Sequence, residues 1–119
     1  MEKLLEESLL YDFYSELLTD HQKQVFQDFV MGDLSLGEIA EERGISRQGV
    51  HDMLKRTRRQ LQEYESRLHL VDKFLHIKEN ACRINELTEE ILTNSSDQTL
   101  AAQNVRMIRQ LSDQIVEEL

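Results

Sequence analysis

The chain has 119 residues, enough for one domain or for a small domain with a helical arm. It contains no proline and four glycines, a composition that favours helix almost throughout. No apolar run reaches the ~20 residues of a membrane span, and the acidic start "MEKLLEESLL" does not resemble a leader, so we expect a cytoplasmic protein. A formal net charge of −9 opposes nucleic-acid binding by the chain as a whole.

A single cysteine, Cys82, excludes an internal disulfide and suits a reducing compartment. It shares a stretch with His69 and His76, but this stretch lacks the close histidine pair or second cysteine of a metal site. We therefore predict no metal and expect Cys82 to be a small buried apolar residue. Since the sequence lacks a phosphate-binding glycine loop, a dinucleotide fingerprint and a zinc-hydrolase motif, we expect neither an enzyme nor a cofactor.

The first part of the chain predicts two helices. Residues 4–18 carry apolar side chains at helical spacing over a broad face, which indicates the first helix. Thr19 and Gln22 then have the spacing of a capping box, in which each side chain accepts from the backbone N–H of the other. Apolar residues continue at helical spacing from Val25 to Val30, and Gly32 marks the end of the second helix.

The next two helices have the pattern of a helix-turn-helix. Ser35 and Glu38 repeat the capping box before a short helix that ends at Gly44, and Ser46 caps the helix after it. The motif needs a small residue where its helices cross, a left-handed residue at the turn, and apolar residues on the inner side of its second helix. The residues that fill these structural roles are Ala40, Gly44, Ile45, Val50 and Met53.

The second half predicts a long helix, a break and a last helix. Neither glycine nor proline occurs after Val50, so we expect one helix whose apolar positions shift around Phe74, which allows a bend that the sequence does not locate. The polar segment "TNSSDQ", residues 93–98, separates it from a last amphipathic helix. The two helices should form a hairpin whose apolar stripes are too wide for one neighbour to cover. We therefore expect a homodimer.

This pattern divides the chain into a helix-turn-helix domain, residues 1–66, and a helical C-terminal arm for oligomerisation, residues 67–119. Positive charge is concentrated around the helix-turn-helix. Residues 35–73 carry eight basic and seven acidic side chains, whereas residues 1–34 carry two and eight, and residues 74–119 carry four and eight. The flanking parts of the chain therefore repel phosphates.

The helix that follows Ser46 has one cationic side. With successive residues about 100° apart, Val50 and Leu61 lie on its inner side and basic residues on its outer side. Its first turn would meet base edges, and the later residues would meet phosphates. The candidate nucleic-acid contacts are Arg47, Gln48, His51, Lys55, Arg58 and Arg59.

Two residues in this helix oppose DNA reading. Asp52 lies among the candidate contacts, and Gly49 weakens the helix by about 1 kcal/mol relative to alanine. The alternative is that the basic residues form the solvated face of a long helix, compensated by Glu63 and Glu65.

Residues 18–70, "LTDHQKQVFQDFVMGDLSLGEIAEERGISRQGVHDMLKRTRRQLQEYESRLHL", resemble the YlxM family of small bacterial helix-turn-helix proteins, and the preceding "YDFYSELLT" strengthens the match. Residues 35–61 also resemble the promoter-reading fourth region of bacterial sigma factors. By that analogy the DNA-reader positions would be Arg47, Gln48 and His51. Gly49 and Asp52 depart from the sigma pattern, which argues against promoter reading.

The resemblance implies an all-α protein: a sigma-region-four-like helix-turn-helix bundle, followed by a long helix and a C-terminal helix. YlxM-like proteins are commonly associated with the genes of the signal recognition particle and its receptor, so it also implies an accessory or regulatory role in that pathway, without enzymatic activity. We expect contacts with the particle's protein, its receptor or its RNA. The alternative is a transcriptional regulator whose dimer presents two recognition helices to DNA.

Overall fold

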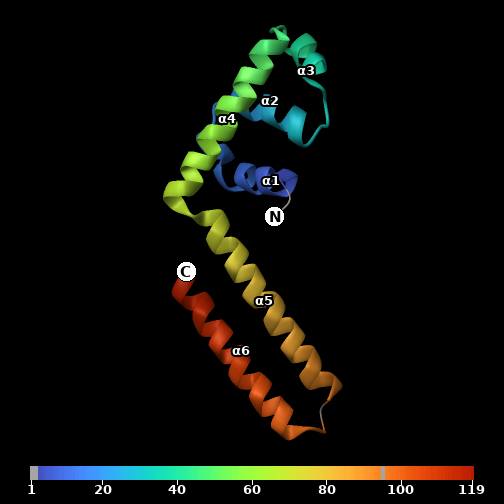
Figure 1. The fold of residues 1–119 in the computed structure, drawn as a ribbon, viewed down its shortest axis with the longest axis vertical. Helices are drawn as coiled ribbons and strands as arrows, with labels where there is room; N and C mark the ends of the chain where they lie inside the picture. The colour runs from blue at the N-terminus through green and yellow to red at the C-terminus, as the bar shows by residue number, and fades with distance from the viewer. Residues whose placement is uncertain (1–2, 95) are drawn as a thin grey trace. The chain divides into compact units, whose positions relative to one another are not determined.

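Helices make up nearly all of the described chain. The computed structural model describes residues 3–94 and 96–119, and these ranges contain six α-helices, one short 3₁₀ helix and no strand (Figure 1). The elements are α1 (Lys3–Tyr14), η1 (Ser15–Leu17), α2 (Asp20–Val30), α3 (Leu36–Arg43), α4 (Arg47–Leu68), α5 (Leu70–Thr93) and α6 (Gln98–Glu118). The predicted all-α fold class is confirmed. In the same ranges no helix is both long and apolar enough to cross a membrane.

Two predicted capping boxes set the starts of α2 and α3. Thr19 Oγ1 accepts from Gln22 N at 3.2 Å, while Gln22 Oε1 accepts from Thr19 N at 3.0 Å. Ser35 Oγ likewise accepts from Glu38 N at 3.1 Å, and Glu38 Oε1 from Ser35 N at 3.2 Å. Because the first turn of a helix leaves its backbone donors without intrahelical acceptors, these side chains define where each helix begins.

Contacts along the chain divide it into two compact units, one ending at Val71 and the other beginning at Asp72. In the first unit, α1, α2 and α3 each pack against α4. The rings of Tyr11 and Phe26 stack between α1 and α2 with their centroids 5.5 Å apart. Among residues 5–71, the buried side chains are Leu10, Tyr11, Tyr14, Leu18, Val25, Phe26, Ile39, Ala40, Val50, Leu54, Thr57, Leu61 and Val71.

The prediction of one uninterrupted helix after Val50 is wrong. Helix α4 ends at Leu68 and α5 begins at Leu70, because His69 between them adopts a left-handed conformation with φ of 56°. Histidine is among the non-glycine residues that enter this region most readily. The interruption therefore needs neither glycine nor proline, and it lies upstream of Phe74, where the apolar pattern shifts.

A tyrosine and a glutamate cap the start of α5. Leu70 N donates to Tyr14 Oη at 3.1 Å, and Val71 N donates to Glu65 Oε1 at 3.0 Å. Tyr14 Oη in turn donates to Glu65 Oε1 at 2.5 Å. Burial and the hydrogen bond to Glu65 raise the pKa of the Tyr14 hydroxyl above its ordinary value. These groups satisfy the backbone donors that the break at His69 exposes.

The second unit is an antiparallel hairpin of α5 and α6 (Figure 1). The amide of Asn104, 3% exposed, donates to Leu87 O at 3.1 Å and to Glu90 Oε2 at 2.8 Å. Asp97 caps α6 by accepting from Leu100 N at 3.0 Å. Among the described residues of this unit only Leu87 and Asn104 are buried, so the two helices cover little of their apolar surface.

Cys82 and His76 lie in different surroundings on α5. Cys82 is exposed, so the expectation that it is buried is wrong. It lies on the side of α5 opposite the seam with α6, where no neighbouring helix of the unit covers it. His76 Nδ1 lies 3.5 Å from Glu118 Oε1 and its Nε2 lies 3.9 Å from Asp72 Oδ1. No cluster of metal-ligating side chains occurs within the described ranges.

Candidate nucleic-acid interface

Helices α3 and α4 form the helix-turn-helix. Gly44, with φ of 69°, follows the last residue of α3, and Ile45 N donates back to Ala40 O at 3.1 Å. Only a residue that tolerates positive φ allows this tight end to α3. Of the predicted structural residues, Ala40 and Val50 are buried, while Ile45 and Met53 are half-buried. The turn thus holds α4 against the core by one side.

Arg43 anchors α3 to α2. Its guanidinium donates twice to Asp28 Oδ2, at 2.7 Å from Nη2 and 3.2 Å from Nε, and once to Gln24 Oε1 at 2.8 Å. The hydrogen bond that Arg43 donates to the Asp28 carboxylate raises the pKa of Arg43. This basic residue of the motif is therefore committed to the fold, and it fixes the platform from which α4 begins.

The start of α4 depends on a cap and a glycine. Ser46 Oγ accepts from Gly49 N at 2.9 Å, and a Cβ on Gly49 would lie only 3.1 Å from that hydroxyl. Gly49 thus leaves room for the cap, which explains why a poor helix former stands in a recognition helix. Arg47 and Gln48 are exposed in the first turn, as a groove-reading helix requires.

Asp52 occupies the middle of the exposed side of α4. Its Oδ1 accepts from Gln48 Nε2 at 3.0 Å and lies 3.6 Å from His51 Nδ1. The Gln48 amide is therefore held along the helix by an intrahelical partner. A carboxylate at this place also repels phosphate oxygens from the neighbouring turns.

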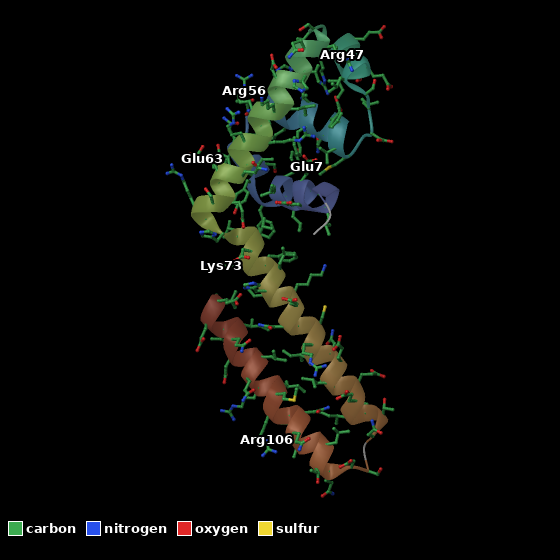
Figure 2. All side chains as sticks on the ribbon, viewed as in Figure 1. Glu7, Arg47, Arg56, Glu63, Lys73 and Arg106 are labelled. Atoms are coloured by element: carbon green, nitrogen blue, oxygen red, sulfur yellow. The ribbon has the colours of Figure 1, made fainter. Side chains whose placement is uncertain are left out.

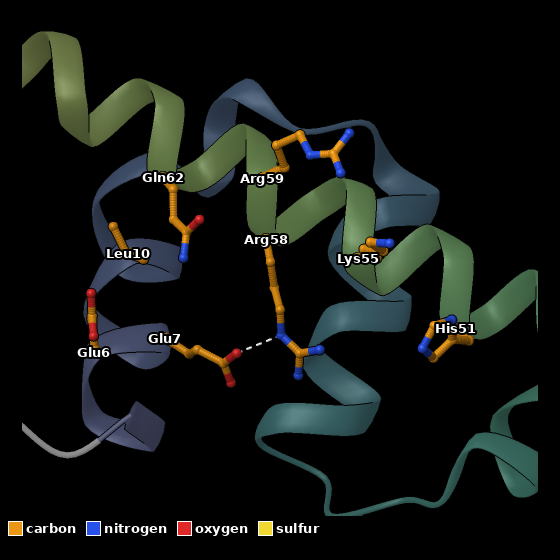
Figure 3. Close-up of a pocket in the computed structure, with 8 residues that line it drawn as sticks. All are labelled: Glu6, Glu7, Leu10, His51, Lys55, Arg58, Arg59 and Gln62. Atoms are coloured by element: carbon orange, nitrogen blue, oxygen red, sulfur yellow. Dashed lines mark hydrogen bonds and ion pairs between the residues drawn. The ribbon is translucent and has the colours of Figure 1, made fainter.

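Arg58 differs from the expectation that it points outward. Its Nε donates to Glu7 Oε1 at 2.5 Å (Figure 3). Its Cζ lies 5.5 Å from the centroid of the Phe29 ring. The side chain of Arg58 is 32% exposed and that of Glu7 is 13% exposed. Since Arg58 lies next to the buried stripe of Leu54 and Leu61 on the helix, it reaches α1 and α2 and keeps only part of its side chain in solvent.

A cleft of about 620 Å³ separates α1 from the exposed side of α4 (Figure 3). Within it Arg58 points toward Glu7, whereas Arg59 points away from that carboxylate. The cleft is lined by Glu6, Glu7, Leu10, His51, Lys55, Arg58, Arg59 and Gln62. Acidic side chains of α1 therefore border the basic side of α4, and a phosphate that approached Arg58 would meet them.

The exposed basic side chains of α4 include Arg56, which is absent from the predicted nucleic-acid contacts. Arg56 is exposed and lines a shallow depression of about 470 Å³ together with Asp52, Lys55 and Arg59. Figure 2 shows Arg47 and Arg56 on α4, with Arg47 nearer its start. Arg56 stands at the edge of the outer arc counted from Arg47, so the helical projection passed over it. We call Arg47, Lys55, Arg56 and Arg59 the outer basic surface.

Comparison with known proteins places this architecture in a family. Residues 1–108 match the family model described as "Putative helix-turn-helix protein, YlxM / p13 like". The chain is 38% identical over 117 residues to a UPF0122 protein of Acetivibrio thermocellus, covering 98% of this chain and 97% of the relative. It is 45% identical over 87 residues to a UPF0122 protein of Bacillus velezensis, covering 73% and 79%.

A UPF0122 protein of Bacillus thuringiensis is 42% identical over 90 residues, with 76% of this chain and 82% of the relative covered. These matches extend over the helix-turn-helix and, for the first relative, over nearly the whole chain. The chain belongs to the YlxM/p13-like family of helix-turn-helix proteins.

Proposed function

We propose that this protein is a non-enzymatic accessory protein of the signal recognition particle pathway, which acts as a homodimer and binds its ribonucleoprotein partner through the outer basic surface and the acidic helices. The pathway is inferred from the resemblance to YlxM proteins. The proposed binding surface lies on the helix-turn-helix. The observation that carries the proposal is the mixture of charges around α4.

The mixed charge favours a mixed partner. Asp52 lies inside the outer basic surface, and Glu6 and Glu7 of α1 border it. Duplex DNA presents phosphates on both sides of a docked helix, so these carboxylates would meet phosphates there. A ribonucleoprotein offers RNA phosphates beside a cationic protein surface, and both signs of charge then find a complement.

The test measures affinity for four probes at physiological ionic strength: the reconstituted particle, its RNA alone, its protein alone and random duplex DNA. The variant replaces Arg47, Lys55 and Arg59 with glutamine. Its matched control replaces Arg67, Lys73 and Arg83, one lysine and two arginines outside the outer basic surface. We expect the variant to bind the particle roughly tenfold or more weakly, with a shallower salt dependence, because up to three phosphate contacts are lost.

The control should bind like the parent. The proposal predicts that the particle or its protein is bound more tightly than duplex DNA. Nanomolar, sequence-dependent binding to DNA, together with no measurable affinity for any particle component, would overturn the proposal.

That outcome would instead support a dimeric transcriptional regulator. One observation favours this second function: Arg47 and Gln48 are exposed in the first turn of α4, where a recognition helix meets base edges. Such a dimer needs its two recognition helices about 34 Å apart. Footprinting on genomic fragments would then show two protected half-sites at that spacing.

A further inference from the structure

The α5–α6 hairpin has two unlike sides. His76 and Glu118 contact each other along one of them, 3.5 Å apart. When successive residues are placed about 100° apart, the residues that flank the seam on this same side are mostly charged or amide-bearing. They are Asp72, Arg83 and Glu90 of α5, and Gln103, Gln110 and Gln114 of α6. We call this the polar side of the hairpin.

The opposite side of the hairpin carries exposed apolar residues, with the polar residues Asn85, Thr88 and Ser112 among them. It carries Ala81 and Leu92 of α5, the latter 75% exposed. From α6 it carries Val105 and Val116, which are 57% and 68% exposed. The half-buried residues Ile84, Ile91, Ile108 and Ile115 border it from the seam. We call this the apolar side; a surface of this kind on both helices of a hairpin is typical of an interface.

We propose that the apolar side packs against the apolar side of a second copy of the chain, with α5 of each copy lying antiparallel to α6 of the other. The result is a four-helix bundle in which every neighbouring pair of helices is antiparallel. This inference rests on the homodimer proposed above and assigns its surface and orientation. It does not depend on whether the partner is a ribonucleoprotein or DNA.

The charges at the rim of the apolar side complement each other in this orientation. One edge of the apolar side is bordered by Lys78 and Glu89 of α5. The other edge is bordered by Arg109 and Asp113 of α6. Because the helices run in opposite directions, Lys78 of one copy lies within about one helical turn of Asp113 of the other. The alternative, α5 against α5 and α6 against α6, brings Arg109 near its own copy at the middle of α6.

The hairpin's internal register sets which residues meet. The Asn104 amide donates to Leu87 O and to Glu90 Oε2, which fixes the level of α6 along α5. Counted from these contacts, Ala81 of α5 stands at the level of Ser112 of α6. In the proposed bundle, Ala81 of one copy therefore faces Ser112 of the other. Ala81 does not face Ala81 of the other copy, since the two α5 helices lie diagonally opposite.

Disulfide trapping tests this orientation. Ala81→Cys and Ser112→Cys are made in separate chains, each with Cys82→Ser, because the exposed native thiol would compete. The two chains are mixed, unfolded together, refolded and oxidised, and run on a non-reducing gel. We expect a disulfide-linked pair in the mixture and none with either chain alone, since a disulfide needs Cα atoms within about 7 Å.

Light scattering gives the second readout. The parent is expected at twice the chain mass of 14.1 kDa. Val105→Glu, on the apolar side, should shift it to the monomer, while Gln103→Glu, exposed on the polar side of the same helix, should not. Circular dichroism shows whether each variant keeps its helices.

The outcomes distinguish the homodimer, its surface and its orientation. A monomeric parent removes the homodimer and the surface together. A dimeric parent that Val105→Glu leaves intact removes only the surface. Trapping of Ala81→Cys with itself, or a dimer with no trapping in the mixture, overturns the orientation.

Discussion

The Arg58 guanidinium of α4 donates to the Glu7 carboxylate of α1 and lies over the ring of Phe29 in α2. One side chain of the recognition helix therefore joins three helices of the first unit. The same contact withdraws a positive charge from the exposed side of α4 and places a carboxylate next to it. Arg58 and Arg59 are adjacent in the chain, but we expect Arg58 to contribute to the stability of the first unit and Arg59 to binding.

Arg58→Gln should lower the stability of the first unit. The change removes a charge-assisted hydrogen bond and a contact with an aromatic ring, and it leaves Glu7, 13% exposed, without its cation. We expect a loss of roughly 1–2 kcal/mol in the free energy of unfolding, since Arg58 keeps some contact with solvent. Urea denaturation followed by circular dichroism measures it.

Arg59→Gln is the matched control for this change. Because Arg59 is exposed, its replacement should alter stability by less than about 0.5 kcal/mol. The particle-binding assay should show the opposite ranking, with Arg59→Gln the weaker binder. Equal stability of the two variants would refute the structural role of Arg58.

Gly44→Ala should destabilise the helix-turn-helix by about 1 kcal/mol, and Gly44→Val by more. No atom of the described residues lies within 4 Å of a Cβ built on Gly44, so the cost comes from its φ of 69° and not from a clash. Gly37→Ala is the control: it lies in α3, and its nearest neighbour would be Ser35 Oγ at 3.9 Å. Thermal melting should move down for Gly44→Ala and up for Gly37→Ala.

Tyr14→Phe should change how stability depends on pH. The pKa of Tyr14 is raised above 10.0 in the folded state, so the protonated hydroxyl stabilises the fold below about pH 10, and this contribution is lost as pH rises through the folded pKa. Tyr14→Phe lacks the hydrogen bonds of the Tyr14 hydroxyl and also the ionisation of that hydroxyl. It should be about 1 kcal/mol less stable than the parent near neutral pH, and the difference should shrink above pH 10.

Tyr64→Phe controls for the general effect of alkaline pH. The Tyr64 hydroxyl donates to Leu17 O at 3.5 Å and takes no part in the cap of α5, so Tyr64→Phe removes a tyrosine hydroxyl while the Tyr14 bonds remain. The dependence on pH that comes from the Tyr14 bonds should therefore persist in this variant. Unfolding free energies at several pH values between 7 and 11 give both curves. Parallel curves for the parent and Tyr14→Phe would contradict the prediction.

Local patterns in the sequence predicted much of the fold. The capping boxes at Thr19 and Ser35 were predictable because each needs only a polar side chain and its partner three residues later. The left-handed turn at Gly44 was predictable because few other residues accept that conformation. Helical periodicity likewise separated the buried and exposed sides of most of α4.

Contacts between distant residues were not predictable in this way. Tyr14 and Glu65 cap α5 together across 51 positions. Without knowledge of that cap, no local pattern predicts that α4 ends at Leu68. Arg58 meets Glu7 across the same separation, so a helical projection alone assigned it to the outer side. The candidate interface was thus identified as a helix, while the partners of its side chains required the tertiary structure.

Thr57→Val should stabilise the protein. Thr57 lies in the buried stripe of α4 with 0% exposure, and its Oγ1 has no hydrogen-bond partner among the described residues. A buried hydroxyl without a partner loses its hydration and gains nothing in return, which costs about 1–3 kcal/mol. Valine has nearly the same shape and removes that cost, so we expect the free energy of unfolding to rise by roughly 1 kcal/mol.

Thr93→Val is the control, since the exposed Thr93 hydroxyl donates to Glu89 O at 2.8 Å and its loss should not stabilise the protein. Urea denaturation of both variants checks this. A less stable Thr57→Val protein would mean that the hydroxyl is satisfied in solution.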